Sequence, residues 1–191
     1  MISNTHIPAI VALAFTVFAA VVYAVSPVRD GNMAEQLMSI PLLLALSALV
    51  WIDIKTFRLP NPITYGLSVV GLIWTLWAGY PILYAVLGGV LGFGLLYLLQ
   101  LYSKWRFGQI GIGLGDAKLV AAIGIWLGPI ALPYVFLMSS VAGLAFALLR
   151  AAPKGFRVSA KDRLAFGPFL AMAFWVGWCM AWRPGTILTL F

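Results

Sequence analysis

Seven apolar stretches constrain the fold of this chain more than any other feature. Spanning a bilayer as a helix takes about 20 mostly apolar residues. Lipid offers no partner to backbone N–H and C=O groups, so each stretch must satisfy its own as a helix. The seven predicted helices are Ile7–Val25, Leu37–Ile54, Ile63–Tyr80, Ile82–Tyr102, Leu114–Leu127, Pro129–Leu149 and Leu164–Arg183.

The composition excludes a water-soluble fold. Hydrophobic residues make up 63% and charged residues 9% of the 191 positions, whereas soluble domains have about 45–50% apolar and about 25% charged residues. We therefore expect an all-α, polytopic transmembrane helical bundle that forms a single integral-membrane domain over residues 1–191. It has about seven spans, or six if the short fifth stretch does not cross.

The first stretch has an alternative interpretation as a secretory signal peptide. Val22, Tyr23 and Ala24 resemble a cleavage site. However, the residues before the apolar run, MISNTHIP, include no lysine or arginine, and signal peptides carry a positive charge there. We expect the first stretch to be retained as a helix.

The basic residues predict the orientation of the bundle, because lysine and arginine gather in cytoplasmic loops. If the N-terminus is cytoplasmic, only Arg29 and Arg183 of the twelve basic residues fall outside. Were the fifth stretch not to cross, the five basic residues between positions 150 and 163 would move outside as well. The distribution of basic residues thus favours seven spans. It also indicates that the net charge of +7 serves membrane orientation and contact with lipid headgroups rather than nucleic-acid binding.

The chain has few residues that could bind a metal ion. One cysteine, Cys179, and one histidine, His6, are present. They exclude a disulfide within the chain, a CxxC zinc site and a site of several histidines. We expect neither a metal nor another cofactor.

Two of the five carboxylates are placed where a charge is costly. Asp30, Glu35 and Asp162 fall in loops. Asp53 ends the second apolar stretch and Asp116 begins the fifth, so the topology puts both at the cytoplasmic end, although 63 residues separate them. Each alone could be a helix-boundary residue in headgroup water. Ionisable groups at membrane depth nevertheless indicate a functional site by default.

The residues around these aspartates predict local structure. After Asp53 the chain reads Leu-Pro-Asn-Pro, in which Asn61 suits a helix N-cap and Pro62 the first helical position. Gly108, Gly111, Gly113 and Gly115 precede Asp116. The spacing from Gly111 to Gly115 fits close helix packing, but the alternate glycines favour extended or irregular backbone, which could pair with a substrate peptide as an added strand.

Two carboxylates that share a water molecule are the machinery of an aspartic protease. Like charges a few ångströms apart share one proton, so the ionised partner activates water and the protonated partner polarises the scissile carbonyl. The helix dipole weakly favours Asp116, at a helix N-terminus, as the ionised partner and Asp53, at a helix C-terminus, as the protonated one.

These residues resemble the type IV prepilin peptidases, which are intramembrane aspartic peptidases of the GxGD class. The resemblance rests on Asp53 with Leu59-Pro60-Asn61, on the G-x-G-D-x-K from Gly113 to Lys118, and on Phe166-Gly167-Pro168. It extends from about Ala45 to Phe191. A GxGD motif alone is moderately specific, whereas all three blocks in this order are strongly specific.

The resemblance implies cleavage of a short basic leader from prepilins or pseudopilins, after a glycine, on the cytoplasmic face of the bacterial inner membrane. It implies that Asp53 and Asp116 are catalytic. The residues implied to bind substrate or support the aspartates are Pro60, Asn61, Gly113, Gly115, Lys118, Gly167 and Pro168. Larger members carry a cytoplasmic domain with CxxC pairs that methylates the new N-terminus; this sequence has no such pairs, so we expect no methyltransferase activity.

Three other functions stay open. A GxGD protease could act on another substrate class, such as signal-peptide remnants, although the LPN and FGP blocks argue against this. A small transporter or channel could use the aspartates to move protons or cations, although such sites are expected near the middle of the bilayer. A non-catalytic pilus assembly protein would tolerate substitution of either aspartate.

Overall fold

The structure is a computed structural model that describes residues 7–108, 113–152 and 164–180. Each predicted apolar stretch contains a helix in these ranges, but some boundaries differ: the third helix ends at Trp77 rather than Tyr80, and the seventh begins at Gly167 rather than Leu164. The helices are α1 (Ile7–Ala24), α2 (Met33–Thr56), α3 (Asn61–Trp77), α4 (Ile82–Phe107), α5 (Leu114–Leu127), the short 3-10 helix η1 (Pro129–Ala131), α6 (Leu132–Ala151) and α7 (Gly167–Cys179). No strand occurs among the described residues, so the all-α prediction is confirmed there.

The lengths and compositions of these helices are those of a membrane protein. The segments Met33–Thr56, Ile82–Arg106 and Pro129–Ala151 are each long and apolar enough to span a bilayer, and the described parts of α1 and α7 are shorter apolar helices. Many large apolar side chains are exposed along these helices, including Leu13, Leu98 and Leu137. In a bilayer these side chains face lipid, which has no tendency to drive them inward.

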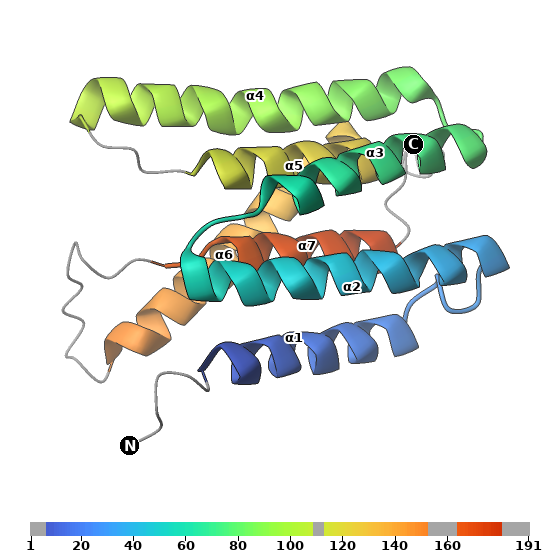
Figure 1. Ribbon diagram of the computed structural model, residues 1–191, viewed down its shortest axis with the longest axis horizontal. Coiled ribbons are helices and arrows are strands. Elements are labelled where there is room, and N and C mark those ends of the chain that lie inside the picture. Colours follow the sequence, from blue (N-terminus) through green and yellow to red (C-terminus); the bar gives the residue numbers. More distant parts are fainter. Residues whose placement is uncertain (1–6, 109–112, 153–163, 181–191) are drawn as a thin grey trace.

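Successive helices run in opposite directions, most of them along one axis and α6 at an angle to it, which brings one set of ends together (Figure 1). This end of the bundle contains the last turns of α2, α4 and α6 and the first turns of α3, α5 and α7. We call it the cavity end, because a cavity lined by residues of these turns opens there. The basic residues Lys55, Lys104, Arg106 and Arg150 occupy those last turns. Arg29, in the loop between α1 and α2, belongs to the opposite end.

Glycines allow α4 and α5 to pack with their backbones in contact. A Cβ added to Gly88 would collide with the carbonyl group of Gly124, and a Cβ added to Gly124 would collide with that of Gly88. A Cβ on Gly92 would lie 2.7 Å from the carbonyl oxygen of Val120. Small residues permit this close approach and its van der Waals contact, which holds helices together in lipid. These contacts hold α5, which carries Asp116 in its first turn, against α4.

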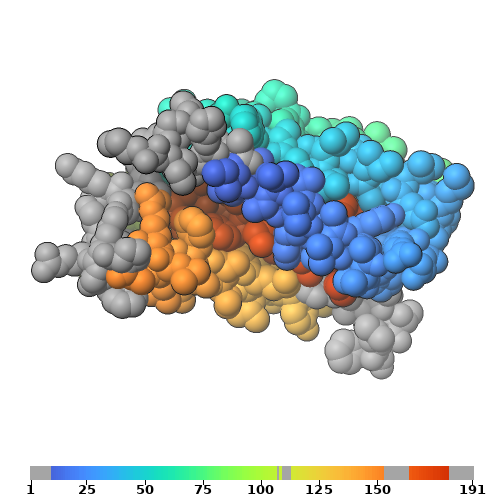
Figure 2. All heavy atoms as spheres, turned by 90° about the horizontal axis from the view of Figure 1, so that it is seen from below, coloured from blue at the N-terminus to red at the C-terminus, as the bar shows by residue number. Residues whose placement is uncertain are grey.

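Helix α7 forms the core of the bundle. Most of its residues are buried, among them Phe174, Trp175 and Trp178, and Figure 2 shows only a strip of α7 between α1 and α6. The Trp175 indole N–H donates to the carbonyl oxygen of Ala19 at 2.9 Å, and the Trp178 indole N–H donates to Ser39 Oγ at 2.8 Å. These bonds tie the last turns of α7 to α1 and to the first turns of α2.

Candidate active site

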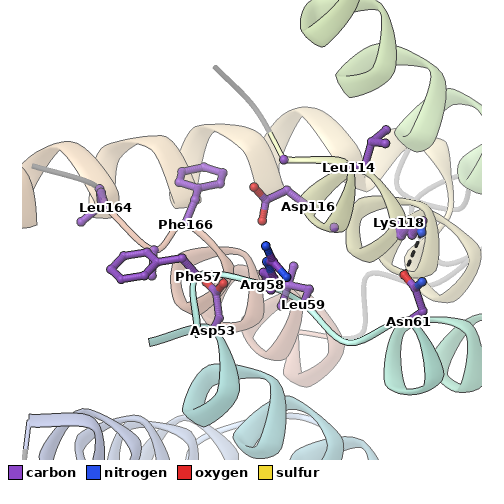
Figure 3. A pocket seen from close by; sticks show the side chains of 13 residues that line it. Asp53, Phe57, Arg58, Leu59, Asn61, Leu114, Asp116, Lys118, Leu164 and Phe166 are labelled. Atoms are coloured by element: carbon purple, nitrogen blue, oxygen red, sulfur yellow. Dashed lines mark hydrogen bonds between the residues drawn. The ribbon is translucent and has the colours of Figure 1, made fainter. Parts of the chain in front are cut away.

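Asp53 and Asp116 line one cavity of about 630 Å³ at the cavity end of the bundle (Figure 3). Four segments that are distant in the sequence form its walls: the end of α2, the loop that leads to α3, the start of α5 and the segment before α7. The lining residues are Asp53, Phe57, Arg58, Leu59, Asn61, Gly113, Leu114, Gly115, Asp116, Lys118, Leu164, Ala165 and Phe166. The structure therefore brings together the two aspartates that the sequence singled out.

Asp53 is held in a fixed position by the start of α7. It lies in the last turn of α2 and is only 5% exposed. Its Oδ2 atom accepts a hydrogen bond of 3.0 Å from the backbone N–H of Gly167. Burial of a carboxylate is unfavourable unless a hydrogen-bond donor compensates for the lost water. The backbone N–H of Gly167 is such a donor. The bond engages Oδ2 and leaves Oδ1 to face other groups.

A side chain at position 167 would crowd this bond. A Cβ at this position would lie 2.6 Å from Asp53 Oδ2 and 3.2 Å from a methyl carbon of Leu59. The next residue, Pro168, is buried in the first turn of α7 and does not line the cavity. The sequence placed Gly167 and Pro168 together as supporting residues, and of the two the structure shows a hydrogen bond to the aspartate from Gly167.

Asp116 lies in the first turn of α5 and is partly buried. Its backbone N–H donates to the carbonyl oxygen of Gly113 at 3.1 Å, as expected for the start of a helix. A carboxylate here interacts favourably with the partial positive charge of the helix N-terminus. No hydrogen bond joins the Asp53 and Asp116 carboxylates in the part of the chain that the structure describes. The two groups share the cavity, which has room for water and a peptide group.

The glycines before Asp116 correct one prediction. Gly113 is extended (φ −74°, ψ 140°), but α5 begins at Leu114, so Gly115 is helical. A Cβ on Gly115 would lie 3.0 Å from Leu59 Cβ. Gly115 therefore provides space for the loop after α2, and the extended backbone predicted up to Asp116 is wrong at this position. Gly111 lies outside the described residues.

Asn61 and Lys118 join two walls of the cavity. The Lys118 ammonium donates a 2.7 Å hydrogen bond to the side-chain oxygen of Asn61, which lies 57 positions earlier. It also lies 5.2 Å from the centre of the Tyr65 ring, in the range of a cation–π contact. The N-cap prediction for Asn61 is wrong, because Pro60 occupies that position and its carbonyl oxygen accepts the first bonds of α3. Pro60 itself does not line the cavity.

Sequence reasoning missed several cavity residues. Phe57, Arg58 and Leu59 belong to the loop between Asp53 and Asn61, so their position between two recognised residues was a usable signal. Leu164 and Ala165 directly precede the Phe166-Gly167-Pro168 block, in the same stretch that carries the resemblance, so their position was also a usable signal. Arg58 is a second cationic residue, in addition to Lys118, that lines the cavity with the two carboxylates. Within the described ranges, no group of three or more His, Cys, Asp or Glu side chains is arranged to hold a metal ion.

Comparison with known proteins identifies relatives. A family profile described as the type IV leader peptidase family matches residues 40–148, a range that includes both aspartates and ends before α7. The chain is 41% identical over 132 residues to a prepilin leader peptidase/N-methyltransferase of Neisseria gonorrhoeae, a match that covers 69% of this chain. It is 41% identical over 142 residues, or 74% of this chain, to the protein of that name from Burkholderia pseudomallei.

The matches cover less than half of the length of each relative. They cover 44% of the Neisseria protein and 45% of the Burkholderia protein, so the chain spans somewhat under half the length of the curated relatives that it matches. A protein of the same name from Aeromonas salmonicida is 39% identical over 132 residues, with 45% of its length covered. No solved structure matches the chain.

Proposed function

The chain belongs to the type IV leader peptidase family, and from this premise we propose that it is an aspartic endopeptidase with Asp53 and Asp116 as its catalytic pair. Its substrates are prepilins or pseudopilins, from which it removes the short basic leader by cutting after a glycine. The single observation that carries this proposal is the shared cavity. Two carboxylates from α2 and α5 face one space of a size suited to a peptide group.

The arrangement suits general acid–base hydrolysis. One aspartate is ionised and accepts a proton from water as the water oxygen attacks the scissile carbonyl carbon. The other is protonated and donates its proton to the carbonyl oxygen, which gives a neutral tetrahedral intermediate. The intermediate then collapses: the C–N bond breaks, and the leaving amine takes the proton that the first aspartate received. One hydroxyl group of the intermediate returns its proton to the second aspartate as the carbonyl group re-forms, which restores the starting protonation of the pair. Protonation belongs to the pair, since two close carboxylates titrate as one unit.

The Gly167 N–H gives Asp53 a defined part in this scheme. Because Oδ2 accepts the backbone bond, Oδ1 is the oxygen through which Asp53 exchanges a proton with water or substrate. The bond to this one oxygen limits the orientations that the carboxylate can take relative to the cavity. Preorganised geometry of this kind is what converts a pair of carboxylates into a catalyst.

The same proposal includes an orientation in the membrane. All seven helices cross the bacterial inner membrane, and the N-terminus and the cavity end face the cytoplasm. The support is the gathering of Lys55, Lys104, Arg106 and Arg150 at the cavity end. A leader of basic residues is repelled by these side chains, so its recruitment depends on anionic lipid headgroups or on contacts at the cut itself.

Two alternatives fit the cavity less well. A proton or cation transporter would carry its acidic groups near the middle of the bilayer, whereas both aspartates lie at one end of the bundle. A pilus assembly protein without catalysis needs no paired carboxylates and would keep its activity when either is replaced.

Co-expression with a candidate prepilin tests the proposal. The substrate carries a short basic leader, a glycine and an apolar helix, and its intact mass is measured after expression with the wild-type, Asp53→Ala and Asp116→Ala proteins. We expect loss of the leader with the wild type and with neither variant. Cleavage that persists in both variants would show that the catalytic assignment is wrong. If the wild type leaves every candidate intact, the peptidase proposal fails.

A further inference from the structure

Phe57 has a backbone conformation that is unusual for its residue type. It lies directly after α2 with φ 52° and ψ 33°, which is the left-handed region. Among the described residues it is the only non-glycine with a positive φ; the others are Gly79, Gly108 and Gly128. A side chain with a Cβ is disfavoured in this region by contact with the following carbonyl oxygen.

The chain contains a direct comparison for this position. Helices α2 and α4 end in the same way, with a left-handed residue whose N–H bonds to the carbonyl oxygen four positions earlier: Phe57 to Asp53 and Gly108 to Lys104. Glycine is the usual residue for this cap, and α4 uses it. The capping geometry therefore does not account for a phenylalanine at the end of α2.

Burial in the core does not account for Phe57 either. The residue is 50% exposed, although it lines the cavity. Its ring lies on the same side of the cavity as Leu164 and Phe166, and Asn61 and Lys118 lie on the opposite side (Figure 3). The bond from its backbone N–H to the Asp53 carbonyl oxygen, 2.7 Å long, holds the Phe57 backbone next to the catalytic Asp53. Strained residues of this kind gather at functional sites.

From these observations, and on the basis of the proposed function, we propose that Phe57 determines specificity on the apolar side of the cut. Its ring, with Leu164 and Phe166, packs against the side chain of the first residue of the substrate's apolar helix, directly after the scissile bond. Aromatic rings suit this task because they offer a large, rigid apolar surface. Phe57 takes no part in proton transfer and acts by placing the scissile bond between the aspartates.

The test compares two substrates with purified protein in nanodiscs. One synthetic prepilin carries phenylalanine directly after the cut and the other carries alanine, and kcat/KM is measured for each with the wild type, Phe57→Gly and Phe57→Tyr. We expect the wild type to prefer the phenylalanine substrate, and Phe57→Gly to lose about tenfold in kcat/KM for that substrate alone. Phe57→Tyr retains the ring and the preference. Phe57→Gly also unfolds no more easily than the wild type, because glycine suits the left-handed cap.

A matched control distinguishes substrate contact from anchoring in the membrane interface. Trp105 is a 79% exposed aromatic residue near the end of α4, at the same end of the bundle, and does not line the cavity. We expect Trp105→Ala to leave the substrate preference unchanged. Equal losses for both substrates in Phe57→Gly, or no loss, would overturn this inference while the peptidase function stands. A wild type that cleaves neither substrate would overturn the proposed function and this inference with it.

Discussion

The contact between Gly167 and Asp53 allows a strong prediction from the smallest possible substitution. Replacing Gly167 with alanine adds one methyl group, whose carbon would lie 2.6 Å from Asp53 Oδ2 and 3.0 Å from Asp53 Cγ. Gly167 does not have a positive φ, so alanine imposes no backbone strain of its own. The whole effect of the substitution therefore acts on the aspartate and on the neighbouring Leu59 side chain.

The displacement can be converted into a rate. Ordinary contacts begin at 3.4 Å, so the Asp53 carboxylate has to move by a distance on the order of 1 Å, and its bond to the Gly167 N–H lengthens. Misplacement of a catalytic group by this distance reduces the rate about 100-fold, which corresponds to about 2.7 kcal/mol of transition-state free energy. The cost in folding stability is that of modest overpacking, about 1–3 kcal/mol.

Cleavage of a synthetic prepilin by the purified protein in nanodiscs measures this effect as kcat, with thermal unfolding recorded on the same samples. Gly94→Ala is the matched control, since a Cβ on that α4 glycine would meet no atom within 4 Å. We expect wild-type activity for Gly94→Ala and a loss of about 100-fold in kcat for folded Gly167→Ala. Wild-type kcat in a folded Gly167→Ala protein would refute the view that Gly167 positions Asp53.

Two further predictions concern the packing that holds the cavity together. Lys118→Met and Asn61→Leu each remove one partner of the 2.7 Å bond between α5 and α3. Each variant is expected to lower the free energy of unfolding by about 1–2 kcal/mol, and the double variant to lower it by less than the sum of the two. Fully additive losses in this double-mutant cycle would show that the bond makes no energetic contribution. Gly124→Ala places a methyl group against the Gly88 backbone. It is expected to lower the free energy of unfolding by about 1–3 kcal/mol or more, as measured by denaturation in detergent. Gly66→Ala is the control, because its added Cβ would lie in open space, and equal stabilities of the two variants would contradict the packing described for α4 and α5.

The sequence allowed the helices to be predicted because the bilayer imposes a simple rule. Each apolar stretch must form its own backbone hydrogen bonds, so stretch and helix coincide closely; Leu114–Leu127 is identical in the prediction and in α5. The shared location of Asp53 and Asp116 followed from the same rule, since alternating helix directions bring the end of α2 and the start of α5 to one end of the bundle. The number of spans and their orientation remain predictions.

What could not be predicted depends on contacts between distant residues. The bond from the Gly167 N–H to Asp53 joins positions 114 residues apart. The Phe166-Gly167-Pro168 block implied that Gly167 supports the aspartates, but the local sequence does not indicate a backbone hydrogen bond to Asp53. Asn61 looked like a helix cap because asparagine favours that position. The helix instead begins one residue earlier, and the Asn61 side chain bonds to Lys118 from another helix.

Glycine patterns were the least reliable guide. The alternate glycines suggested extended backbone, but glycine serves both unusual conformations and close packing, and the local sequence does not distinguish the two. At Gly115 the reason is the proximity of Leu59, which becomes visible only in the folded chain. Phe57 shows the opposite case: its backbone is left-handed, a conformation typical of glycine, and a phenylalanine in the sequence gives no indication of it.

The most direct test of the central claim is a comparison of single and double aspartate variants in purified form. Initial rates of prepilin cleavage are measured for wild type, Asp53→Asn, Asp116→Asn and the double variant, all in nanodiscs and all verified as folded. If the two carboxylates act as one unit on one water molecule, each single variant is as slow as the double variant, about 10³-fold or more below wild type. A single variant that retains substantial activity, or losses that multiply in the double variant, would contradict a shared catalytic cavity.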